Sequence, residues 1–77
     1  MTHVPHKLTE AFPEYAKQLH FLKLDNAHFR HLAHEYDTVN REIHLGETRI
    51  QPMSDFHLED LKKTRLKLLD GIKRMLN

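Results

Sequence analysis

Histidine stands out in this chain as a source of chemistry, with eight copies in 77 residues. His28, His31 and His34 follow one another at intervals of three, and Glu35 comes directly after them. On a helix, neutral imidazoles at i and i+3 can share a zinc or nickel ion. His28 and His34 would lie about 120° apart around that helix, however, which is awkward for three ligands on one ion. We therefore predict partly exposed structural histidines and no metal site, with His28 and His31 as weak candidates.

Positive charge gathers near the end of the chain and suggests a second chemistry, the binding of phosphates. The candidate nucleic-acid-binding residues are Lys62, Lys63, Lys67, Lys73 and Arg74. Glu59, Asp60 and Asp70 interrupt this row, and 12 Lys+Arg stand against 11 Asp+Glu in the whole chain, for a net charge of +1. A dedicated nucleic-acid binder is usually more basic. We therefore favour a solvated, ion-paired face, with nucleic-acid binding as the alternative.

Groups for covalent or acid–base catalysis are scarce. Ser54 is the only serine, a helix cap accounts for it, and there is no cysteine or glycine-rich loop. A two-helix hairpin also offers no cavity near the roughly 300 Å³ of a small-molecule site. The sequence predicts no enzymatic activity, no cofactor and no small-molecule substrate.

The length of the chain limits it to one domain with a small core. A chain of 77 residues buries only about 60% of the surface that it exposes when unfolded, and oligomerisation often supplements such a core. No stretch approaches the roughly 20 apolar residues of a membrane span, and the polar opening lacks the apolar middle of a signal peptide. Together with the absence of cysteine, this predicts a soluble cytoplasmic protein.

Two amphipathic segments must position any site. In the first, apolar residues recur every seven positions, which is a heptad pattern: Tyr15, Leu22, Phe29, Tyr36, Ile43 and Ile50. The pattern predicts a helix over about 13–45, with Pro13 in its first turn and Gly46 as its left-handed cap. A break near residue 25 is an alternative, because Asp25 could cap a new start at Asn26 and leave a short third helix before it. Residues 1–11 show no period and are expected to be a flexible lead-in.

The second segment is expected to form a helix over about 55–76. Ser54 is a good N-cap, and Met53 and Leu58 are spaced as a hydrophobic staple around it. A second seam follows, with one polar member: Leu58, Leu61, Arg65, Leu68, Ile72 and Met75. The fold class is therefore all-α, an antiparallel helical hairpin with coiled-coil-like packing over residues 12–77.

Folding the second helix back on the first predicts a definite pairing. The expected pairs are Ile43 with Leu58, Val39 with Leu61, Tyr36 with Arg65, Leu32 with Leu68 and Phe29 with Ile72. This register leaves apolar residues of the first segment without a partner. Further apolar residues of the second helix widen its apolar face beyond a two-stranded seam. Either the first segment bends near residue 25 and packs on the flank of the hairpin, or the surplus contacts another chain. We expect an interaction or assembly module that binds itself or another helical protein through Phe12, Tyr15, Leu19, Leu22, Leu69 and Leu76.

Three stretches of the chain, in this order, resemble the YdcH-like family of small bacterial proteins, whose domain of unknown function is described as coiled-coil. They are FPEY at 12–15, DNAHF at 25–29 with the later YD at 36–37 and REI at 41–43, and KKTRLKLLD at 62–70. The N-terminal extension is longer than this family leads us to expect, and Gly71 stands where the family tends to have an ordinary helix former. The resemblance implies a bacterial cytoplasmic helical hairpin, and it implies no catalytic residue.

Overall fold

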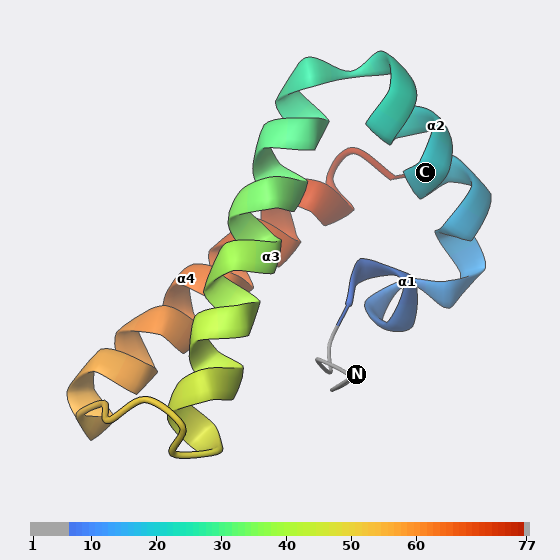
Figure 1. Cartoon of the computed structure of the whole chain (residues 1–77). Helices are drawn as coiled ribbons and strands as arrows, with labels where there is room; N and C mark the ends of the chain where they lie inside the picture. The colour runs from blue at the N-terminus through green and yellow to red at the C-terminus, as the bar shows by residue number, and fades with distance from the viewer. Residues whose placement is uncertain (1–6, 77) are drawn as a thin grey trace.

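The computed structural model describes residues 7–76, and within that range the chain forms helices and turns without a strand. The elements are α1 (Leu8–Ala11), a 3₁₀ turn (Pro13–Tyr15), α2 (Ala16–Asp25), α3 (Ala27–Glu47) and α4 (Asp55–Lys73). Figure 1 shows α3 and α4 side by side as an antiparallel pair, with α2 and α1 leading away from one end of α3 and back toward its middle. The expected all-α helical hairpin is confirmed.

The first helical segment breaks at Asn26. Asn26 has an extended backbone (φ −125°, ψ 109°), and its Oδ1 accepts a hydrogen bond from the Phe29 N–H at 3.0 Å, so it is the N-cap of α3. Arg30 of α3 stabilises the bend between α2 and α3. Its Nη1 donates hydrogen bonds to the carbonyl oxygens of Lys23 and Leu24, each at 3.1 Å. The structure thus has the break that the sequence left open, with the cap one residue after Asp25.

The prediction that Gly46 is a left-handed cap is wrong. Helix α3 continues through Gly46 to Glu47, and Arg49 adopts the positive φ, at 60°. The Ile50 N–H then donates to the Leu45 carbonyl and the Arg49 N–H to the Gly46 carbonyl, at 3.1 and 3.2 Å, which is the Schellman pattern. Glycine is needed at position 46 because a side chain would not fit there. A Cβ there would lie 2.7 Å from the Sδ of Met53 and 2.9 Å from the Cδ2 of Leu58.

Helix α4 begins where the sequence places it. The Ser54 Oγ accepts a hydrogen bond from the His57 N–H at 3.1 Å, as expected of the N-cap. The helix ends at Lys73, before the expected residue 76, and a turn follows it. Gly71 leaves room for a side chain, since the nearest atom to an added Cβ, the Cδ1 of Leu32, is 3.7 Å away.

Contacts at the two glycines of the hairpin show how the long helices pair. Leu58 lies against Gly46, and Leu32 lies near Gly71. Helix α3 extends two residues beyond the expected end at Leu45, while α4 begins at Asp55 as expected. The individual pairs of the predicted register stay predictions.

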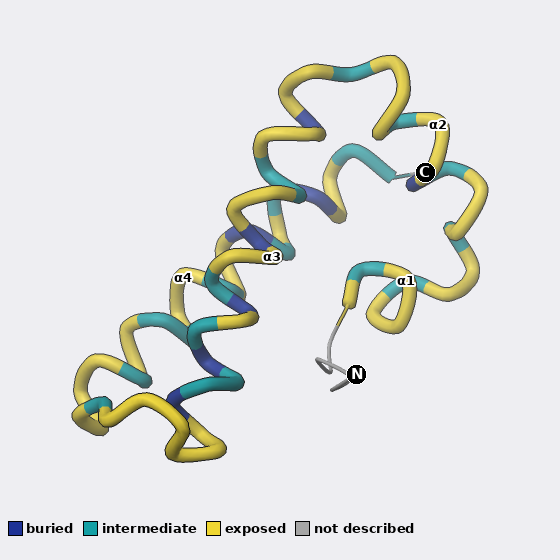
Figure 2. Tube along the Cα trace, in the orientation of Figure 1, coloured by how far each residue is buried: buried dark blue, intermediate teal, exposed yellow. Residues whose placement is uncertain are grey.

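The core lies between the hairpin and the N-terminal arm, which we define as α1, the 3₁₀ turn and α2. It is a cluster of five buried residues, Leu19, Phe29, Tyr36, Leu68 and Ile72. Figure 2 shows buried positions along the facing sides of α3 and α4, with the outer sides exposed. Because Phe29 and Ile72 share the cluster, the two helices meet as the heptad pattern requires.

The N-terminal arm bends back on the flank of the hairpin, which is the first of the two expected alternatives. Leu19 of α2 is 5% exposed within the core cluster, and Leu8 of α1 packs against that cluster. The expected lead-in over 1–11 lies partly outside the described residues, and its described part includes the helix α1. None of the helices in residues 7–76 is both long and apolar enough to cross a membrane.

Candidate functional site

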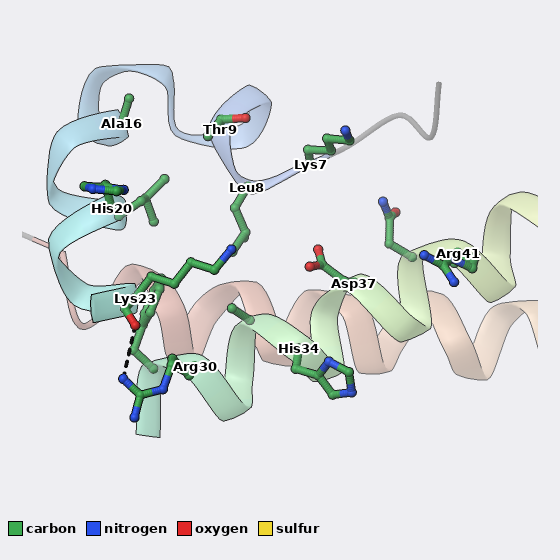
Figure 3. Close-up of a pocket in the computed structure, with 14 residues that line it drawn as sticks. Lys7, Leu8, Thr9, Ala16, His20, Lys23, Arg30, His34, Asp37 and Arg41 are labelled. Carbon is green, nitrogen blue, oxygen red and sulfur yellow. Dashed lines mark hydrogen bonds between the residues drawn. The ribbon is translucent and has the colours of Figure 1, made fainter. Parts of the chain in front are cut away.

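A groove opens between the N-terminal arm and α3. Its volume is about 780 Å³, and its walls come from Lys7 to Thr9, from the inner side of α2 and from α3 between Phe29 and Arg41. Figure 3 shows Leu8 and Lys23 of the arm and Asp37 of α3 pointing into the space between the arm and the hairpin, whereas His34 points away from the arm. The prediction of no sizeable cavity is wrong, because it rests on a hairpin of two helices alone. The arm supplies a third wall that a two-helix hairpin lacks.

The floor of the groove is apolar, and its rim is cationic. Leu19 and Phe29, which are buried in the core, line the groove together with Leu8 and Ala33. The charged and titratable side chains that line the groove are Lys7, Lys23, Arg30, Arg41, His20, His34 and Asp37. Four permanent cations therefore face a single carboxylate in the lining, on a chain whose net charge is only +1.

These cations differ in how they are held. Arg30 is fixed by its hydrogen bonds to the last carbonyls of α2. The side chains of Lys23 and Arg41 make no ion pair within residues 7–76, and Arg41 lies on the next turn of α3 after Asp37 (Figure 3). An anion entering the groove would meet one rigid guanidinium and two cations free to reach it.

A hydrogen bond between the buried Asn40 and the half-buried Arg65 supports the α3 side of the groove. Asn40, which lines the groove, is 3% exposed, and its Oδ1 accepts a hydrogen bond from the Arg65 Nη1 at 3.1 Å. Arg65 was expected to lie against Tyr36, and its charge is close enough to oppose the rise in the pKa of Tyr36. Burial, the largest cause, raises that pKa above its ordinary value. Sequence reasoning missed Asn40, which sits next to the expected seam residue Val39.

The six expected partner-binding residues take part in the internal packing of the chain. Leu19 is buried, and the other five are half-buried against the same core: Phe12, Tyr15, Leu22, Leu69 and Leu76. The bend at Asn26 thus lets the six residues pack against the core of their own chain. Their binding to a partner stays a prediction.

The histidine candidates lie apart from the groove on the outer side of α3. The His31 Nε2 is 2.8 Å from the Glu35 Oε1, and both side chains are largely exposed. His28 is exposed as well. In the part of the chain that the structure describes, no three histidine, cysteine or acidic side chains come together as a metal-binding group.

The candidate phosphate-binding cations of α4 face away from the groove. Lys62 lies 3.3 Å from Glu47 of α3, in an ion pair that joins the two helices. The remaining four, Lys63, Lys67, Lys73 and Arg74, are exposed. At 100° per residue, Glu59 and Asp70 fall between Lys62 and Lys63 around the helix, so acids separate the cations as the sequence indicated.

Large apolar side chains are exposed at three places. Phe21 and Leu24 are on α2, Ile50 and Phe56 are at the closed end of the hairpin, and Leu66 is on the outer side of α4. Ile50 continues the heptad pattern beyond the end of α3, where the helix that would have buried it has stopped. Phe21 and Leu24 fall outside the heptad pattern. Their exposure could have been predicted from that position.

The hairpin is also the part of the molecule that has recognisable relatives. Residues 29–76, more than half of the chain, match the model of a family described as protein of unknown function (DUF465). The match covers nearly all of α3 and the whole of α4 but stops short of the arm, and the finer resemblance to the YdcH-like family stays a prediction. No curated protein and no solved structure matches the chain significantly. The chain belongs to the DUF465 family of proteins of unknown function.

Proposed function

We propose that this protein is a small protein-interaction module that binds an acidic helical segment of a partner protein in the groove between the N-terminal arm and α3. One observation carries the proposal: four cations and one carboxylate surround an apolar floor, on a chain that is almost neutral as a whole. A ligand that fits this lining has to bring both apolar and anionic groups. We place the function in the cytoplasm, as the lack of cysteine suggests.

The shape of the groove favours a peptide over a small molecule. Along α3 it extends from Phe29 to Arg41, which at 1.5 Å per residue is about 18 Å, or three turns of helix. Its volume of about 780 Å³ is spread along an open surface rather than enclosed. Amphipathic helices bind to such surfaces by placing their apolar side in the groove and their charges on the rim.

The chemistry of the groove also favours an acidic peptide over a nucleic acid. The floor consists of Leu8, Leu19, Phe29 and Ala33, and it suits aliphatic side chains. Phosphate contacts alone would leave that floor open to water. Rim charges act mainly on the association rate and on specificity, so binding should weaken with salt without being abolished.

Fluorescence anisotropy tests the proposal with a labelled amphipathic helical peptide of about 12 residues, made of leucine, alanine and glutamate, because that length spans about 18 Å. Replacing Lys23 and Arg41 together by glutamate removes the two unpaired rim cations. We expect the affinity to fall at least about tenfold. Circular dichroism checks that the helices remain.

The matched control replaces Lys63 and Lys67 of α4 by glutamate, which changes the net charge equally but leaves the groove intact. We expect little change in affinity, and no binding of the same peptide with lysine in place of glutamate. An equal loss in both double variants would show general charge attraction and refute the groove. A labelled single-stranded RNA that binds more tightly than the peptide, and that the α4 variant weakens more, would establish the nucleic-acid alternative instead.

A further inference from the structure

Helix α2 is apolar on two sides, and only one of them packs within the chain. Its inner side contributes Leu19 to the core, while Phe21 and Leu24 are 60% and 61% exposed. At 100° per residue, Phe21 and Leu24 are about 60° apart, so they form one stripe, and Lys17 lies between them in angle. The groove-lining residues Leu19 and Lys23 are on the other side of the helix.

Two opposite charges lie symmetrically along the helix, one on each side of Phe21. Lys17 precedes Phe21 by four residues, and Asp25 follows it by four. Both side chains are exposed, and neither makes an ion pair within residues 7–76. Lys17, Phe21 and Asp25 form an i±4 row, which is the row that most often packs between helices.

A surface with this pattern is complementary to itself. When two copies of α2 cross antiparallel about a two-fold axis at Phe21, Lys17 of each copy lies next to Asp25 of the other. A two-fold interface requires this property, because the same patch serves on both sides. A shallow hollow beside Phe21, lined by Gln18, Leu22, Asp25 and Asn26, can receive the aromatic ring of the second copy.

We infer that this protein forms a homodimer through the outer side of α2, with Phe21 and Leu24 at the centre and Lys17 and Asp25 in reciprocal ion pairs. The inference does not rest on the proposed function, because the groove opens on the opposite side of α2 and stays accessible in the dimer. A ten-residue helix buries less than the roughly 1,200 Å² of a standard interface. The dimer is therefore weak and depends on protein concentration.

Sedimentation equilibrium of the full chain at several concentrations up to about 1 mM tests the dimer. We expect a monomer–dimer equilibrium that Phe21→Glu abolishes. Phe56→Glu is the matched control, since Phe56 is 88% exposed at the far end of the molecule, and it should leave the equilibrium unchanged. A wild-type chain that stays monomeric throughout, or equal effects of the two variants, would overturn the inference.

A charge-reversal cycle then tests the pairing itself. Lys17→Glu and Asp25→Lys should each weaken the dimer by roughly fivefold or more, because each breaks two reciprocal pairs, and the double variant should recover the affinity to within about twofold. Both changes suit α2, since acids are favourable near a helix N-terminus and cations near its C-terminus. Failure of the double variant to recover would refute this pairing, even if Phe21→Glu still acts.

Discussion

The hairpin and the N-terminal arm are both helical, but they are held in different ways. In the hairpin, Tyr36 and Ile72 are wholly inaccessible to solvent, and Phe29 and Ile43 nearly so. In the arm, Leu19 is the one buried side chain among the described residues, and the apolar residues around it are half-exposed. Local stability follows the number of buried apolar groups. We therefore expect the hairpin to be the more rigid part and the arm to open at lower free energy.

This difference matters for the groove, because one wall belongs to each region. The wall on α3 is fixed by the core and by the hydrogen bond between Asn40 and Arg65. The wall on α1 and α2 is held by the buried Leu19, by half-buried residues such as Leu8, and by the Arg30 hydrogen bonds to the end of α2. A ligand in the groove would therefore order the arm more than the hairpin.

The largest expected effect tests the rigid region. Ile72→Ala removes a side chain that is 0% exposed at the centre of the core, and we expect the free energy of unfolding to fall by about 2–5 kcal/mol. Urea denaturation followed by circular dichroism measures it. A loss below about 1 kcal/mol would show that the hairpin core is not what stabilises the fold.

Leu19→Ala makes the matched change in the arm. Because Leu19 joins the arm to the hairpin, we expect amide exchange in α2 to accelerate while α3 and α4 keep their protection. Hydrogen exchange resolved by residue measures this. Uniform acceleration along the chain would mean that the arm and the hairpin unfold together, and the distinction between the two regions would fail.

The junction between the regions is tested at Asn26. Asn26→Ala removes the acceptor for the Phe29 N–H at the start of α3 and should lower stability by about 0.5–2 kcal/mol. Ser54→Ala removes the corresponding cap of α4, entirely within the hairpin, and serves as the comparison. We expect only the Asn26 variant to speed amide exchange in α2 as well.

The two glycines of the hairpin should respond to alanine with opposite signs. Gly71→Ala meets its nearest neighbour at 3.7 Å, so it should stabilise the helix by roughly 0.5–1 kcal/mol. Gly46→Ala forces Met53 and Leu58 to move and should destabilise the protein by about 1 kcal/mol. Thermal melting of the two variants measures both shifts. Stabilisation by both would show that the turn end of the hairpin has free space.

The smallest effect appears only in alkali. Burial raises the pKa of Tyr36 above its unfolded value near 10, so the folded state favours the protonated phenol. This contribution to stability is fully present below the unfolded pKa and is lost as pH rises through the folded pKa. Relative to Tyr36→Phe, the wild type should therefore lose stability above about pH 10. Denaturation of both proteins at pH 8 and about pH 11 measures the difference. An equal change in the free energy of unfolding of the two proteins would contradict it.

Local signals predicted the hairpin well and the groove poorly. The heptad from Tyr15 to Ile43 and the cap at Ser54 each depend on residues close in sequence, and these features are present. The open alternative at residue 25 was decided by Asn26, one position later than Asp25. The groove escaped prediction because it requires two segments to meet, and the pattern of each segment alone says nothing about the angle between them.

By itself, the sequence determined the two long amphipathic helices, the turn between them and the near-neutral charge, since helix periodicity and capping are local properties. Only the tertiary structure decided the register, the bend of the arm and the gathering of Lys23, Arg30 and Arg41 around one groove. These features depend on packing between residues far apart in the chain. Steric fit at positions such as Gly46, which no local pattern encodes, selects among arrangements that bury similar apolar area.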